Sequence, residues 1–351
     1  MKSSPAISPA PRSTRPVPVA GSRPRRASAG QIAGQIFAQY GLLVVFAAIV
    51  IVFSLAEPTT YFTQQNAQTI AASNAVVAVL ALGAMVPLVV GQFDLSVGFQ
   101  LGLAQTLCAG FMLKQGLPAS VAMVLCMAVG VLIGAINGFL VVAVKMNSFI
   151  ATLGTGTLAA GVTLWYSKGQ SVFGDMPQSF LNLGRDDVLG IPLPMLYVVV
   201  LVALLWLAFE YTAWGRACFA IGGNARAALI AGVRVDRLTV QCFIAAGVFS
   251  SLAGILSVMI LGSANPNVGT NFLLPAFAAA FLGATSIRPG RFNAIGTFVA
   301  VYLLAAGITG LQQLGAASYV DQFFYGAALL IAVALSGWAA RRRRARVSTE
   351  G

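Results

Sequence analysis

The sequence contains no histidine and only nine acidic residues among 351. Without histidine, the chain can form neither a histidine proton relay nor a histidine-ligated metal site. Its four cysteines form no C-x-x-C pair, which argues against a zinc site or a disulfide framework. No G-x-x-x-x-G-K-S/T segment occurs, so the chain lacks an ATP-binding P-loop. We therefore expect no catalytic residues, no metal and no cofactor, and the chain is not predicted to be an enzyme.

Charged residues are also scarce. They make up 9% of the chain, against about 25% in soluble domains, whereas 58% of the residues are hydrophobic. So few charges cannot cover a water-facing surface, and the lipid bilayer is the expected solvent. The apolar runs are about 16 to 25 residues long, a length typical of membrane-crossing helices. The sequence predicts an all-α integral membrane protein. Its net charge of +12 does not indicate nucleic-acid binding, because the basic residues gather at the ends of the apolar runs.

About ten transmembrane helices are predicted within a membrane domain spanning 36–340, between a disordered basic cytoplasmic tail, 1–35, and a second basic cytoplasmic tail, 341–351. The predicted spans are 39–56, 67–91, 95–113, 118–144, 148–167, 191–209, 239–262, 272–287, 293–312 and 321–338. If the N-terminus is cytoplasmic, all but three of the 21 basic residues lie on the cytoplasmic side, the exceptions being Lys114, Lys168 and Arg185. This positive-inside bias favours an even number of spans and two cytoplasmic termini.

The predicted span 118–144 carries three glycines on one face. Gly130, Gly134 and Gly138 follow one another at a spacing of four residues. Such a ridge lets two helices approach closely in a membrane. We expect it to pack within the chain, and a contact with a second copy is the alternative.

Asp94 stands between two predicted spans and is flanked by Gly91 and Gly98. Two interpretations fit this position. In the first, the carboxylate lies at a break between helices, where it lines a path or fixes a gate, because acidic groups inside membranes are usually functional. In the second, it is a structural helix cap near the cytoplasmic face, and Ser96 is a further capping candidate. The glycines permit the turn that both interpretations need.

The longest cytoplasmic loop, 212–238, is predicted to contain a short helix. Asn224 is suited to begin this helix and Gly232 to end it. The segment between them is rich in alanine, including Ala227 and Ala228, with Arg226 expected to be exposed. A small apolar surface in water favours docking on a partner. An ordinary connector is the alternative.

Several segments together resemble the permease subunits of ribose-type ABC importers, which serve monosaccharides and polyols. They are GQFDLSVG at 91–98, NSFIATLGT at 147–155, GRACFAIGGNARAALIAGVRV at 215–235, GATS at 283–286 and GT at 296–297. The likeness covers residues 38–338. The chain departs from the family pattern at Gln92 and Phe93, which replace a small residue and isoleucine, and at Arg288 and Pro289, which replace small residues.

The resemblance implies the type II ABC importer transmembrane-domain fold and a translocation path for a ribose-like sugar or polyol across a bacterial inner membrane. It implies three partners: ABC ATPase subunits, a periplasmic sugar-binding protein, and a second permease copy in a homodimer or heterodimer. The signature turn would comprise Gly91, Asp94, Ser96 and Gly98. The ATPase-coupling segment would comprise Gly223, Asn224, Arg226, Ala227, Ala228 and Gly232.

Neutral sugars need hydroxyl and amide partners, so the polar residues within the predicted spans are candidates for the path. They are Asn74, Gln100, Gln105, Asn137, Thr155, Thr157, Gln312 and Gln313. Hydrogen bonding between neighbouring helices is the alternative role for each of them. Other functions also remain open: a proton-coupled secondary sugar transporter, which would need titratable groups near the midplane, a passive channel, and a membrane scaffold.

Overall fold

The computed structural model describes residues 29–349, and most of these residues lie in helices. The helices are α1 (Ala29–Ala56), α2 (Gln64–Ser73), α3 (Ala75–Val89), α4 (Ser96–Leu113), α5 (Ala119–Val142), α6 (Ser148–Ser167), α7 (Gln178–Arg185), α8 (Leu193–Tyr211), α9 (Ala213–Ile230), α10 (Val235–Leu261), α11 (Gly269–Gly283), α12 (Ala294–Gln313) and α13 (Tyr319–Thr349). Two short antiparallel ribbons pair β1 (Val172–Phe173) with β4 (Ser263–Ala264), and β2 (Asp187–Val188) with β3 (Ile191–Pro192).

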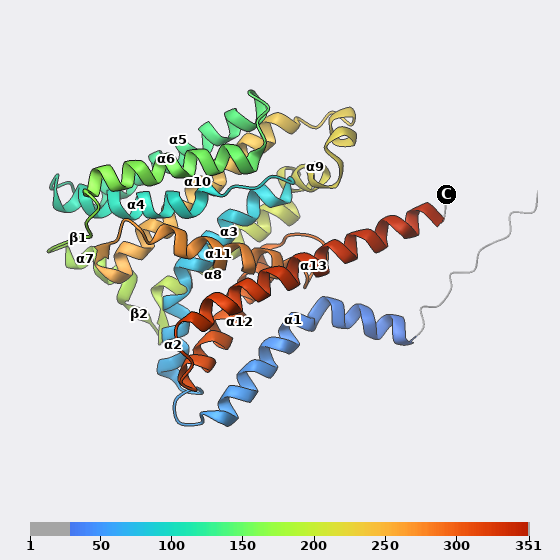
Figure 1. Cartoon of the computed structure of the whole chain (residues 1–351), viewed down its shortest axis with the longest axis horizontal. Coiled ribbons are helices and arrows are strands. Elements are labelled where there is room, and N and C mark those ends of the chain that lie inside the picture. The colour runs from blue at the N-terminus through green and yellow to red at the C-terminus, as the bar shows by residue number, and fades with distance from the viewer. Residues whose placement is uncertain (1–28, 350–351) are drawn as a thin grey trace, which may run out of the picture.

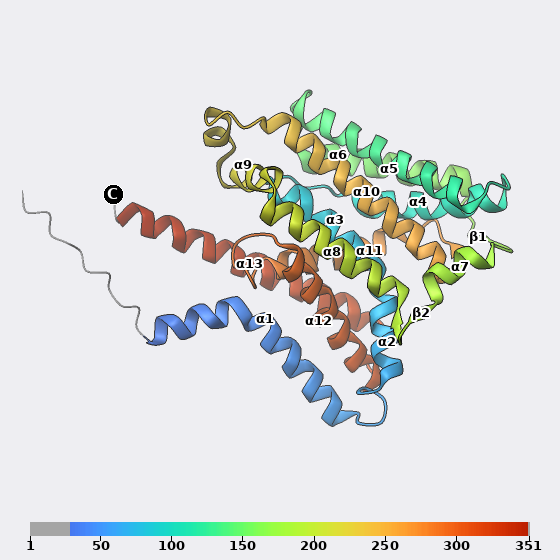
Figure 2. The same cartoon turned by 180° about the vertical axis from the view of Figure 1, so that it is seen from behind.

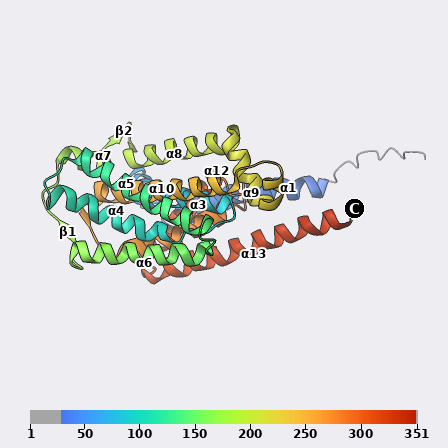
Figure 3. The same cartoon turned by 90° about the horizontal axis from the view of Figure 1, so that it is seen from above.

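Three apolar helices form the centre of the bundle. Every residue of α3 is buried, and most of α4 and α10 is buried as well. Helix α10 packs against α3, α4 and α5, and α4 also contacts α6 and α11 (Figure 1). Figure 3 shows α6 and α13 along one side of the bundle and α8 along the other. Helices α1, α5 and α8 are also apolar but mostly exposed at the rim, where lipid would cover them.

The described residues contain seven helices that are long and apolar enough to cross a membrane. The bent pair α2–α3, which turns by 41° at Asn74, gives an eighth candidate, and α11 and 319–334 of α13 are shorter apolar helices. The predicted spans fall on these elements, but the sequence did not predict the break inside 67–91. Of the predicted tails, 1–28 and 350–351 lie outside the described residues, while α1 begins at Ala29 and α13 continues to Thr349.

The connecting loops gather at two ends of the bundle (Figure 1 and, from behind, Figure 2). At the end that carries α9, the Lys145 ammonium lies 3.9 Å from Asp236, and Ile287 N–H donates to the Gln39 carbonyl. At the opposite end, β1 pairs with β4, and Gln312 donates to the Asp321 carboxylate. We call these the α9 end and the β end. Successive loops along the chain therefore lie alternately at the α9 end and at the β end.

The glycine ridge of α5 packs within the chain, against α10. A Cβ atom on Gly130 would lie 2.4 Å from the Gly247 carbonyl oxygen, and one on Gly134 would lie 2.5 Å from the Phe243 carbonyl oxygen. At Gly138 the nearest atom, Val240 Cα, would be 2.9 Å away. All three distances are shorter than a real Cβ tolerates, so the backbones of α5 and α10 touch because these residues lack side chains. The prediction of packing within the chain is confirmed.

Replacing Gly134 with alanine should lower stability although alanine is the better helix former. The added methyl group meets backbone atoms of α10 that cannot rotate away, and overpacking of this kind costs about 1–3 kcal/mol. The matched control is Gly326→Ala on α13, where a Cβ atom meets nothing within 4 Å; this change should be neutral or stabilise the helix by up to about 1 kcal/mol. The midpoint of thermal unfolding in detergent measures both. Equal shifts for the two variants would contradict the packing described here.

Candidate functional site

The turn between α3 and α4 is held in place by its own side chains and by α6. Gly91 leaves α3 with φ of +75°, a left-handed conformation that glycine adopts readily. The Asp94 side chain is completely buried, and its Oδ1 atom accepts hydrogen bonds from the backbone N–H of Ser96 at 3.0 Å and from the Ser96 hydroxyl. Asp94 therefore stabilises the first residues of α4, as the structural interpretation predicts.

Helix α6 supplies two further hydrogen bonds to the same turn. The backbone N–H of Phe93 donates to Ser148 Oγ at 3.2 Å, and that of Leu95 donates to Thr152 Oγ1 at 3.0 Å. Every backbone N–H of 93, 95 and 96 thus finds a side-chain oxygen, which a turn in an apolar environment requires. Sequence analysis did not identify Ser148 and Thr152, although both lie in the 147–155 motif.

Ser96, a capping candidate from the sequence, does not cap α4 with its hydroxyl. Instead it connects Asp94 to a network that reaches three helices. Its Oγ atom accepts from Gln100 Nε2 at 2.6 Å and from Asn137 Nδ2 at 2.8 Å. Asn137 Oδ1 in turn accepts from Thr155 Oγ1 at 2.6 Å. The result is a continuous polar network from the signature turn through α4 and α5 to α6.

This network is enclosed in the helix bundle. Asp94 and Asn137 have no exposed surface, and Gln100 is 1% exposed. Because no solute could reach these groups without a large rearrangement, they are better suited to fix the ends of α4, α5 and α6 relative to one another. Two acceptor atoms, Asp94 Oδ2 and Gln100 Oε1, are buried without a hydrogen-bond partner among the described residues.

The other candidate path residues lie apart from this network. Gln105 donates to Ser257 on α10 at 2.9 Å, and Asn74 donates to the Ile70 carbonyl at the break between α2 and α3. Gln312 and Gln313 lie at the β end, where Gln313 donates to Asn66 at 3.0 Å. Thr157 is exposed on α6. The predicted path residues therefore do not line one channel inside this single chain.

The short helix in the 212–238 loop forms where the sequence predicts it. Asn224 has extended backbone angles, φ −162° and ψ 100°, which break α9, and its Oδ1 atom accepts from Ala227 N–H at 3.0 Å. A further helical stretch then runs to Ile230, and Gly232 ends it with φ of +83°. Gly223, Arg226 and Ala227 are exposed at the α9 end. The capping role of Asn224 is thus confirmed.

The exposed face of this short helix differs from the predicted one. Ala228 is only 5% exposed and packs toward the body of the protein. Leu229 and Ile230, at 63% and 83% exposed, form its outer apolar surface. Sequence analysis missed this pair because a helix of about two turns is too short for hydrophobic periodicity to identify its buried side.

Comparison with known proteins places the chain in a transport family. Residues 66–333 match the family model described as the branched-chain amino acid transport system / permease component. The chain belongs to this permease family. No solved structure matches it.

Among its relatives, the ribose import permease protein RbsC of Bacillus subtilis (strain 168) is 37% identical over 288 residues, which cover 82% of this chain and 89% of the relative. The D-allose transport system permease protein AlsC of Escherichia coli (strain K12) is 32% identical over 297 residues, 85% of this chain and 91% of the relative. The autoinducer 2 import system permease protein LsrD of Escherichia coli O9:H4 (strain HS) is 33% identical over 262 residues, which cover 73% of this chain and 79% of the relative.

These comparisons confirm the resemblance to the permeases of monosaccharide ABC importers. Together with the apolar helices of the bundle, they identify the permease as a multi-pass membrane protein.

Substitutions at Asp94 should separate its hydrogen bonding from its charge. Asp94→Asn keeps an oxygen that accepts from Ser96, so the permease should remain abundant in membranes and monodisperse in detergent. Asp94→Leu leaves two buried donors of Ser96 unpaired, at about 1–3 kcal/mol each, and should reduce both properties strongly. Asp175, an exposed acid at the β end, provides the control: Asp175→Leu should be tolerated. If Asp94→Leu equals the unaltered permease in membrane abundance and monodispersity, then Asp94 has no structural role.

Proposed function

We propose that this chain is the permease subunit of an ATP-driven importer that carries a ribose-like monosaccharide or polyol across the bacterial inner membrane. One observation carries the proposal. A chain without a P-loop presents, at one end, a capped short helix whose outer residues, Leu229 and Ile230, are large, apolar and exposed. Apolar side chains on a surface outside the lipid indicate a protein partner. The ATPase subunits of the importer are that partner, and the α9 end is cytoplasmic.

A ten-span topology with both termini in the cytoplasm supports this orientation. Under it, the loops of the α9 end carry Lys145, Arg226, Arg288 and most other basic residues, as the positive-inside rule requires. The loops of the β end carry only Lys114, Lys168 and Arg185. In this topology α11 and 319–334 of α13 cross the membrane as shorter spans within the type II transmembrane-domain fold.

The translocation path lies between two permease copies in this account. The polar network around Asp94 is closed to a substrate, whereas α6 exposes Thr157 together with Gly154 and Gly161, beside which a side chain would meet no other atom within 4 Å. Small and hydroxyl-bearing residues on an exposed membrane helix favour contact with another helix over contact with lipid. The second copy, identical or related, would cover this face, and a periplasmic sugar-binding protein would deliver the substrate at the β end.

The substrate assignment rests on the relatives. Proteins named for ribose and allose import align with more than four fifths of this chain. In the proposed mechanism of alternating access, the ATPase subunits close on the cytoplasmic side and the short helix of α9 moves with them. The bundle then opens toward one side of the membrane at a time. The permease supplies the path, and the energy comes from its partners.

A charge on the outer surface of the short helix should prevent ATPase binding. Ile230→Asp places a carboxylate where an apolar contact is expected, and burying it unpaired costs on the order of a few kcal/mol. The amount of ATPase that co-purifies with the permease from detergent should fall at least about tenfold, since 1.4 kcal/mol is a factor of ten. Ala228 is unsuitable for this test, because a charge at this buried position would disturb the loop itself.

The matched control is Leu189→Asp, because Leu189 is 98% exposed at the β end. It should leave ATPase binding unchanged. Full retention of the ATPase subunits by Ile230→Asp and by Leu229→Asp, at equal membrane abundance, would show that α9 is not the docking element.

A further inference from the structure

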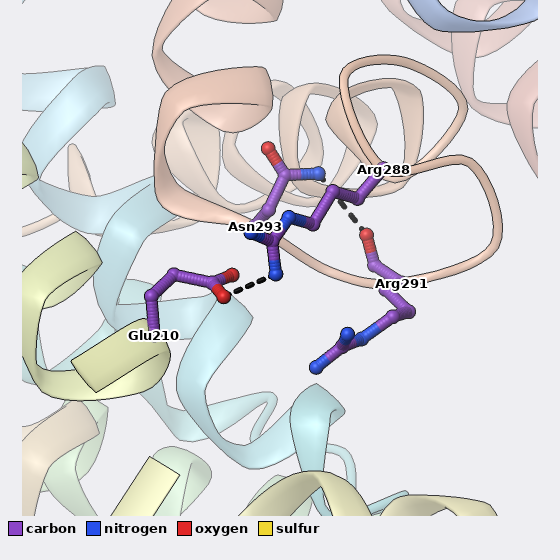
Figure 4. Close-up of polar contacts among 4 residues, drawn as sticks. All are labelled: Glu210, Arg288, Arg291 and Asn293. Carbon is purple, nitrogen blue, oxygen red and sulfur yellow. Dashed lines mark hydrogen bonds and ion pairs between the residues drawn. The ribbon is translucent and has the colours of Figure 1, made fainter. Parts of the chain in front are cut away.

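The loop between α11 and α12, residues 284–293, is closed into a fixed shape by one side chain. Asn293 Nδ2 donates to the carbonyls of Gly283 and Ser286, each at 3.2 Å. It also donates to the Arg291 carbonyl at 3.1 Å (Figure 4). Asn293 Oδ1 accepts from Gly296 N–H at 2.7 Å and so begins α12. Because both ends and the middle of the loop are bonded to this amide, the loop can transmit a displacement as one unit.

Two arginines extend from this loop to the elements around the coupling segment. Arg288 forms an ion pair with Glu210 near the end of α8, and the Glu210 side chain is 11% exposed (Figure 4). The guanidinium carbon of Arg291 lies 3.8 Å from the ring centroid of Phe219, which is on α9 five residues before Asn224. A guanidinium stacked on an aromatic face contributes about 0.5–2 kcal/mol. The loop is therefore attached to α8 and to α9 by side chains.

On its other side the same loop contacts a row of phenylalanines that leads to the signature turn. Phe292 packs edge to face against Phe281 on α11, with ring centroids 5.4 Å apart. Phe281 stacks against Phe93 at 6.2 Å, and Phe93 also stacks against Phe277 at 6.4 Å. A connected path thus runs from Phe219 on α9 to Arg291, along the backbone to Phe292, and through Phe281 to Phe93.

Phe93 lies at the α9 end, beside an open groove of about 530 Å³ lined by residues 91–93 of the turn and 145–149 before and in α6. Phe93 is 39% exposed, while its backbone N–H is held by Ser148. A large ring on a fixed backbone is suited to widen or narrow such a groove when the ring that it contacts, Phe281, is displaced. Phe93 and Arg288 are also positions at which this chain departs from the pattern of the family it resembles.

We propose that the 284–293 loop mechanically links the coupling segment to the signature turn, with Arg291 and Arg288 as positioning residues and Phe93 as the side chain whose placement they control. This inference rests on the proposed function, because it is ATPase binding that would displace α9. A displacement of Phe219 carries Arg291 with it. The loop then shifts Phe281, and the Phe93 ring changes its position in the groove.

The test uses the permease in complex with its ATPase subunits and reports on the groove without requiring the substrate. Gln92, next to Phe93 in the same groove, is replaced by cysteine, and the rate of its reaction with a maleimide is measured with and without ATP and orthovanadate. The four native cysteines are buried and serve as internal background. With the link intact, nucleotide should change the labelling rate about tenfold, equivalent to 1.4 kcal/mol.

The variants alter the Arg291–Phe219 contact from both sides. Arg291→Gln and Phe219→Leu should each reduce the nucleotide response to less than about twofold, whereas Arg291→Lys and Phe219→Tyr, which keep a cation and a ring, should preserve most of it. The control is Arg216→Gln, because Arg216 is an exposed arginine on α9, the helix that carries Phe219. This variant should keep the full nucleotide response. The double charge reversal, Glu210→Arg with Arg288→Glu, restores an ion pair. Its labelling rate should therefore change more with nucleotide than that of either single variant.

Two failures can be told apart. If the ATPase does not bind to the unaltered permease, then the proposed function fails. If Ile230→Asp and Leu229→Asp both leave its binding unaffected, then α9 is not the docking element. If the ATPase binds equally to all variants and Arg291→Gln and Phe219→Leu keep the full nucleotide response, then the mechanical link is wrong and the arginines only hold the loop in place.

Discussion

In an apolar solvent every backbone N–H that leaves a helix must find another acceptor, and this constraint explains where the permease can bend. The turn at 91–95 is satisfied by Asp94, Ser148 and Thr152. Asn147, Asn224 and Asn293 accept from backbone N–H groups at the beginnings of α6, the short helix of α9 and α12. Short oxygen-bearing side chains thus mark the ends of rigid helices, and these ends gather the loops on which the function depends.

The distribution of polarity inside the bundle separates structure from transport. The Asp94 network is buried and joins four segments through Ser96 and Asn137, so it resists movement at that end of the bundle. Apolar surface is instead exposed at Leu229 and Ile230. A rigid interior with an exposed apolar helix at the α9 end fits the proposal that other proteins move this subunit, and the chain belongs to a permease family whose members include sugar import systems.

The features that could be predicted from the sequence are those with a local physical cause. Long apolar runs predicted the helices, and Asn224 predicted a helix start. The four-residue spacing of Gly130 and Gly134 predicted a close helix contact within the chain, although not that α10 is the partner. The break at Asn74 was not predictable, since one polar residue in an apolar run also fits a continuous helix. The burial of Ala228 and the scatter of the path residues depend on which side of each helix meets its neighbours. That is decided by tertiary packing, on which a single sequence carries no direct information.

The central claim is that this permease takes its energy from ATPase subunits that bind at α9, and not from an ion gradient. The most direct measurement is uptake of radiolabelled D-ribose and D-allose by proteoliposomes that contain the permease, its ATPase subunits and the sugar-binding protein. The account predicts accumulation of one of these sugars that requires ATP together with all three proteins and is insensitive to dissipation of the proton gradient. Uptake by the permease alone, driven by a proton gradient without ATP, would contradict it.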